Sequence, residues 1–168
     1  MSMKKITILV IVFCLLSNPA LAQGKYAGTK KSFIGKKFLN SRNIPGLTGW
    51  QFREGSLLTA IDDAEVMTAD VFKKGTTYIV LFSIKEDTAD AKFTIADVIE
   101  VKNVLSSQHI RTGMCSEGAN EAVDIVALAK KQNNVEFSRA IKAWRLNRDK
   151  RRVELISPKL VKCMNEVD

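Results

Sequence analysis

An unbroken run of strand-forming residues, TTYIVLFSI at positions 76–84, places the strongest constraint on how this 168-residue chain folds. Its β-branched and aromatic side chains favour an extended strand. Its continuous apolarity indicates a central strand that is covered on both faces. Because Lys74-Gly75 supplies a turn just before it, residues 67–73 and 76–84 are expected to form a hairpin.

A further strand is predicted at residues 93–101, FTIADVIEV. The alternation indicates one apolar face, made of Phe93, Ile95, Ile99 and Val101. Asp97 falls on that same face. An ionised carboxylate among apolar side chains must be paired, hydrogen-bonded or close to the rim, and we expect one of these three for Asp97.

The last third of the chain permits two interpretations. Residues 120–132 fit a helix or a strand, and we favour the strand because the Val-Asp-Ile-Val segment alternates. Residues 141–147 and 152–156 fit a second hairpin, with a helix over residues 135–146 as the rival. The sequence therefore predicts a mainly β fold, an antiparallel sheet, sandwich or open barrel with at most one or two short helices. An α+β fold is the alternative.

The N-terminus has the three parts of a secretory signal peptide. Lys4 and Lys5 precede an apolar run, Ile6–Leu16, and the small-residue pattern Ala20–Ala22 follows. The run of eleven residues is shorter than the roughly 20 that span a bilayer. We therefore expect cleavage near Ala22 and export to the periplasm or the medium, with no transmembrane segment in the mature chain.

The remaining chain divides into a flexible lead-in, residues 23–31, and one globular domain, residues 32–168. Loss of Lys4 and Lys5 leaves 24 basic against 18 acidic residues, a net charge of +6. Only Cys115 and Cys163 remain of the three cysteines. In an oxidising compartment an even pair predicts one disulfide, and closing a loop of about 48 residues contributes about 4 kcal/mol in the chain-entropy model.

The stretch SSQHIRTGMCSEG, residues 106–118, permits a catalytic alternative. It holds Cys115 and the single histidine, His109, which are the residue types of a thiol nucleophile and its base. Six residues of strand would separate them by about 20 Å, and thiol enzymes draw their partners from distant parts of the sequence. The disulfide is therefore favoured over the nucleophile, and His109 has no assigned role.

One segment is strongly basic. Residues 144–152 include five basic residues and a single aspartate. The basic residues are Arg145, Arg148, Lys150, Arg151 and Arg152. Such charge suits an anionic partner, but a secretory signal argues against nucleic acid as that partner. The competing interpretation is a solvated hairpin turn whose charges keep a sheet edge from aggregating.

No cofactor or metal is expected, because HExxH, CxxC, GxSxG and Gly-rich phosphate-loop motifs are lacking. The acidic stretches 62–65 and 86–90 lack the spacing of a calcium-binding loop. The favoured hypothesis is an exported, non-catalytic binding protein, of the inhibitor or immunity type, that neutralises an envelope-acting enzyme or toxin through a basic surface. The alternatives are an exported thiol-dependent hydrolase that uses Cys115 and His109, and an envelope assembly factor on an anionic membrane surface.

Overall fold

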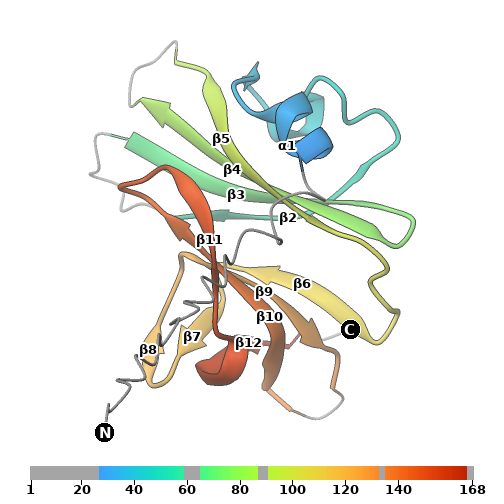
Figure 1. The fold of residues 1–168 in the computed structure, drawn as a ribbon, viewed down its shortest axis with the longest axis vertical. Coiled ribbons are helices and arrows are strands. Elements are labelled where there is room, and N and C mark those ends of the chain that lie inside the picture. The colour runs from blue at the N-terminus through green and yellow to red at the C-terminus, as the bar shows by residue number, and fades with distance from the viewer. Residues whose placement is uncertain (1–26, 59–64, 87–90, 133–134, 166–168) are drawn as a thin grey trace, which may run out of the picture.

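The computed structural model describes residues 27–58, 65–86, 91–132 and 135–165, which fold mostly as antiparallel strands in two sheets (Figure 1). The strands are β1 (Lys37–Phe38), β2 (Gln51–Leu57), β3 (Glu65–Lys74), β4 (Thr77–Glu86), β5 (Phe93–Val101), β6 (Gln108–Thr112), β7 (Cys115–Glu117), β8 (Asn120–Glu121), β9 (Ile125–Lys130), β10 (Phe137–Asn147), β11 (Arg152–Ile156) and β12 (Val161–Met164). The helical elements are α1 (Ala27–Phe33) and two 3-10 turns, η1 (Ser41–Asn43) and η2 (Pro158–Leu160). The mainly β fold is confirmed, and within these described residues the two sheets form a sandwich-like arrangement that does not close into a barrel.

The first sheet has the strand order β1-β5-β4-β3-β2. The predicted hairpin is confirmed: β3 and β4 pair along their whole lengths, and Gly75 takes a left-handed backbone at the turn, with φ of 59°. Ile79 and Leu81 point to one face of β4, whereas Val80 and Phe82 point to the other, and all four are buried. The continuous apolar run is thus a central strand covered on both faces.

The predicted single apolar face of β5 is wrong. Opposite β5, Phe82 pairs with Asp97 and Ser83 pairs with Ile95, so Ala96 is an extra residue that forms a bulge. The bulge reverses the alternation, because one inserted residue exchanges the two faces of a strand. Phe93 and Ile95 therefore pack on one side of the sheet and Ile99 and Val101 on the other.

Asp97 has the polar partners that its burial requires. Its Oδ1 accepts the N–H of Val98 at 2.8 Å, and its Oδ2 accepts the N–H of Val153 at 2.8 Å. Val153 belongs to β11 of the second sheet. The carboxylate that interrupts an apolar strand therefore bonds one sheet to the edge of the other.

The second sheet has β9 between β6 and β10, and β11 lies on the other side of β10. The strand interpretation of residues 120–132 is confirmed by β9. A helix over residues 135–146 is wrong, because this segment is the long strand β10. The residues that such a helix would bury on one face are not buried together. Phe137 and Ile141 are exposed, whereas Ala143 and Leu146 are fully buried.

The other half of β10 continues into a small ribbon, β12-β7-β8. Three apolar cores therefore separate four layers. One lies between the two sheets, a second between the first sheet and the segment containing α1 and η1, and a third between the second sheet and the ribbon (Figure 1). Their central members are, in that order, Phe82, Val126 and Leu146; Phe33, Phe72 and Leu81; and Ile125, Ala143 and Cys163.

Residues 27–31, which we expected in a flexible lead-in, begin helix α1, whose Phe33 is buried against the first sheet. The expected signal peptide, residues 1–22, and residues 23–26 lie outside the described part of the chain. So do residues 62–64 and 87–90, which hold most of the two acidic stretches. None of the helices that the structure describes has the length and apolarity to span a membrane.

Candidate functional site

Cys115 and Cys163 form the expected disulfide. They lie directly opposite each other on β7 and β12, with their Cα atoms 4.0 Å apart, and both are buried. The next residue, Met164, donates its N–H to Met114 across the same two strands. Hydrogen-bonded and non-hydrogen-bonded pairs alternate along antiparallel strands, so the cysteines occupy the second kind, in which side chains approach more closely.

The structure does not bring Cys115 and His109 together in one pocket. His109 lies on β6 opposite Ala129 of β9, whereas Cys115 lies in the ribbon with its sulfur bonded to Cys163. Cys115 packs in the core beneath the ribbon and is not among the residues that line the pocket around His109. The pairing of these two residues as base and nucleophile therefore gains no support from their positions.

The basic segment forms the β10–β11 hairpin that the sequence predicted. Asn147 closes its turn, because its Oδ1 accepts the N–H of Lys150 at 2.9 Å. Arg148 accepts the N–H of Arg151 through its carbonyl, and Arg151 takes a left-handed backbone with φ of 49°. The side chain of Asn147 thus stabilises a turn that lacks the Asn-Gly or Asp-Gly sequence typical of hairpins.

The cations of this hairpin are paired with acids. Arg145 bonds Glu117 at 2.7 Å and Asp124 at 3.2 Å, and the hydrogen bond to Glu117 raises the pKa of its guanidinium. Arg151 forms an ion pair with Glu65 of β3.

Lys150 and Arg152 share one carboxylate, that of Glu154, at 3.0 Å and 2.8 Å. Hydrogen bonds from Arg152, Lys150 and Asn147 lower the pKa of Glu154 to about 2. With Arg148 and Asp149 completing the turn, the segment is not an uncompensated positive surface. The expectation of a basic docking patch at Arg145–Arg152 therefore loses its main support.

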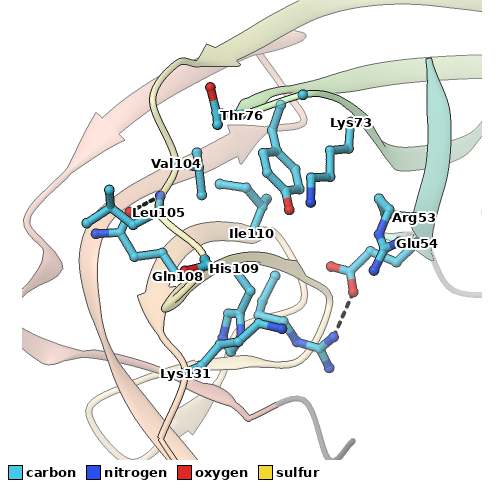
Figure 2. Close-up of a pocket in the computed structure, with 14 residues that line it drawn as sticks. Arg53, Glu54, Lys73, Thr76, Val104, Leu105, Gln108, His109, Ile110 and Lys131 are labelled. Carbon is cyan, nitrogen blue, oxygen red and sulfur yellow. Dashed lines mark hydrogen bonds and ion pairs between the residues drawn. The ribbon is translucent and has the colours of Figure 1, made fainter. Parts of the chain in front are cut away.

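A different group of cations lines a pocket of about 270 Å³ between the two sheets (Figure 2). It lies where the β3–β4 turn and β2 face β6 and the segment before it. Its lining consists of Arg53, Glu54, Lys73, Gly75, Thr76, Tyr78, Val104, Leu105, Ser106, Gln108, His109, Ile110, Arg111 and Lys131. In Figure 2, Arg53 and Lys73 lie on one side of the pocket and His109 and Lys131 on the other.

Among the described residues that line the pocket, Glu54 is the one that carries a carboxylate, and it is already engaged. Glu54 accepts the N–H of Thr112 through Oε1 at 2.8 Å and the guanidinium of Arg111 through Oε2 at 2.8 Å. These bonds balance Arg111 and leave Arg53, Lys73 and Lys131 as the other lining cations. Within the described residues, neither Arg53 nor Lys73 forms an ion pair, so the pocket carries net positive charge.

Local backbone structure positions these cations. Arg53 is the extra residue of a bulge in β2, since Phe52 pairs with Phe72 and Glu54 pairs with Val71. A bulge re-aims a side chain away from the regular alternation of its strand. Lys73 lies near the end of β3, and its Nζ lies 5.5 Å from the centre of the Tyr78 ring. This cation–π contact holds the ammonium at the pocket.

The arrangement suits an anionic group that enters from solvent. Two cations of different geometry, a guanidinium fork and an ammonium, can share the oxygens of one carboxylate or phosphate. In the part of the chain that the structure describes, no three His, Cys, Asp or Glu side chains gather in a group that could hold a metal ion.

Sequence reasoning missed this pocket. Its cations come from β2, the end of β3 and the segment after β9. These segments are far apart in the sequence, so no motif indicates that their side chains meet. The bulge at Arg53, which places the first of them, was not recognisable in the sequence. A comparison of the chain with protein-family models, curated proteins and solved structures finds no match.

Proposed function

We propose that this protein is an exported, non-catalytic binding protein that recognises an acidic side chain of a partner protein through the pocket between its two sheets. The observation that carries the proposal is the net positive lining, in which Arg53 and Lys73 have no carboxylate partner among the described residues while Glu54 is engaged by Arg111 and Thr112. Arg53 is exposed and Lys73 is half-buried, so both cations are accessible to an incoming carboxylate, which they attract by charge complementarity.

The exported setting rests on the signal-peptide pattern at residues 1–22, and a disulfide is compatible with an oxidising compartment. In that setting an inhibitor or immunity-type role, which neutralises an envelope-acting enzyme or toxin, fits a small binding protein. The thiol-dependent hydrolase is not favoured, because Cys115 is bonded to Cys163.

A comparative capture experiment tests the proposal. Wild-type protein and the double variant Arg53→Glu/Lys73→Glu are immobilised and exposed to envelope extract at low salt, and bound proteins are identified by mass spectrometry. We expect a protein that binds the wild type at least ten-fold more strongly than the variant, and whose enzymatic or toxic activity falls when wild-type protein is added.

The control is Arg42→Glu, a single charge reversal at an exposed residue of η1, outside the pocket. It should bind like the wild type. Equal capture by wild type and double variant, or equal loss in Arg42→Glu, would contradict recognition through the pocket. Circular dichroism of all three proteins establishes that the fold is retained.

A further inference from the structure

The outer face of the ribbon carries a second cluster, which adjoins the pocket through Arg111. The guanidinium of Arg111 donates to the carbonyl of Met164 at 3.1 Å and to the sulfur of Met114 at 3.3 Å. Arg139 on β10 and Lys162 on β12 are directly opposite each other, and both are exposed. Met164 donates its N–H toward β7, so its pair with Phe137 on β10 is a non-hydrogen-bonded pair. Lys162, two residues earlier on β12, has the same orientation. Arg139 and Lys162 are therefore a non-hydrogen-bonded pair as well, with closely spaced side chains. Like charges in such a position repel each other.

Neither cation has an acid to relieve this repulsion among the described residues. The row that crosses the ribbon runs from Arg139 through Lys162 and Ser116 to Glu121, so the first carboxylate is two strands beyond Lys162. This contrasts with the β10–β11 hairpin, where Glu65, Glu117, Asp124 and Glu154 neutralise the neighbouring cations.

An apolar row lies beside the two cations. Phe137 and Met164 form the neighbouring cross-strand pair, and Met114 bonds Met164 through the backbone on the next strand. These three side chains are 42%, 37% and 52% exposed. Beneath them the disulfide and Ser138 are buried, so the ribbon presents this face from a cross-linked support.

We infer that this ribbon face, made of Met114, Phe137, Arg139, Lys162 and Met164, is a docking surface for a protein whose own surface combines carboxylates with an apolar centre. Exposed Met and aromatic side chains beside cations are the composition of protein interfaces. Partner carboxylates between Arg139 and Lys162 replace a repulsion by two attractions.

A second copy of this chain does not fit the ribbon face. An interface between identical faces would bring two Arg139–Lys162 pairs together and add to the repulsion. An anionic membrane shares the charge, but membrane-surface binding inserts apolar side chains 5–10 Å deep, roughly, from a helix or a projecting element. Here the apolar row lies on a pleated strand surface, which suits a flat protein surface better.

The test uses a photoreactive side chain in the full exported protein. Phe137→p-benzoylphenylalanine, of similar size, is irradiated in envelope extract, and the adduct is identified by mass spectrometry. The control is Leu39→p-benzoylphenylalanine, at an exposed apolar position directly after β1 of the first sheet. We expect a specific adduct from position 137 that is absent from position 39.

The identified protein is then purified and its affinity measured. We expect the double variant Arg139→Glu/Lys162→Glu to weaken binding at least ten-fold, with a larger loss of affinity at low salt. We expect Lys73→Glu in the pocket to leave the affinity unchanged. Absence of a specific adduct, or an unchanged affinity in Arg139→Glu/Lys162→Glu, would overturn the inference. A loss in Lys73→Glu would assign the partner to the pocket instead. Binding of phosphatidylglycerol vesicles with the same dependence on Arg139 and Lys162 would also overturn it, in favour of a membrane.

Discussion

Glu54 of edge strand β2 accepts the backbone N–H of Thr112 on edge strand β6 at 2.8 Å, and this bond joins the two sheets beside the pocket. Its other oxygen bonds Arg111 at 2.8 Å. Because Glu54→Ala leaves both donors without their acceptor in a half-buried place, we expect a loss of about 2–3 kcal/mol in the free energy of unfolding. Urea unfolding measures it.

Glu54→Gln is the matched control, since its amide oxygen still accepts the N–H of Thr112 while its charge is removed. We expect it to cost less than Glu54→Ala. Equal stability of Glu54→Ala and wild type would show that the sheets do not depend on this connection.

Gly113 follows Thr112 in a left-handed backbone with φ of 71°. A Cβ at this position would lie 2.7 Å from the Cβ of Ser56, whose hydroxyl donates to Thr112 at 2.9 Å. Gly113→Ala should therefore cost about 1 kcal/mol for the backbone and a further 1–3 kcal/mol, approximately, for the collision.

Gly118→Ala separates these two contributions. Gly118 has a similar φ of 65°, but its added Cβ meets no described atom within 4 Å. Thermal unfolding of both variants should show the smaller loss at Gly118. A loss at Gly113 no larger than that at Gly118 would contradict the close approach of Ser56.

Asp70 gives the stability a dependence on pH. It is buried on β3 between Gly55 and Leu81, and burial raises its pKa to about 6, although a hydrogen bond from Thr68 opposes the rise. The unfolded carboxyl has the ordinary pKa of 3.8. Between these two pKa values the folded state holds the proton more tightly, so the contribution of Asp70 to stability falls as pH rises.

The size of this loss is about 3 kcal/mol, on the order of the difference between the two pKa values. Asp70→Asn removes the titration, so its stability relative to wild type should increase from pH 4 to pH 7. Urea unfolding at several pH values measures the difference between the two proteins. A difference that stays constant over this range would show that Asp70 does not titrate as described.

The disulfide between Cys115 and Cys163 is checked by mass spectrometry of the unreduced protein, whose mass should be lower than that of the reduced protein by two hydrogen atoms. Reduction should lower the free energy of unfolding by about 4 kcal/mol in the chain-entropy model. A free thiol at Cys115 in protein isolated from cells would revive the thiol-dependent hydrolase.

The hairpin of β3 and β4 could be predicted from the local sequence, because a β-branched run next to Lys74-Gly75 specifies both strands and the turn. Parity and compartment sufficed for the disulfide, because two cysteines allow one pairing. The face of β5 was not predictable from alternation, because the bulge at Ala96 becomes visible only when β5 is paired with β4.

The proposed binding surfaces depend even more on tertiary structure. A run of basic residues predicted a positive patch at Arg145–Arg152, yet Glu65, Glu117 and Asp124 come to it from other strands. Conversely, no motif in the sequence marks Arg53 and Lys73 as neighbours. A bulge in β2 and the end of β3 bring them to one pocket. Charge clustering along a sequence is therefore a poor guide to charge clustering in a sheet protein.

Titration of the protein with glutarate, whose carboxylates represent an acidic side chain, is a direct test of anion recognition by the pocket. Amide chemical shifts are recorded by NMR at low salt. We expect the largest changes around Arg53, Lys73 and Ile110, and we expect them to disappear in Lys73→Glu but not in Arg42→Glu. Changes confined to residues 148–152, or no change at the pocket at any glutarate concentration, would contradict recognition of an acidic group between the two sheets.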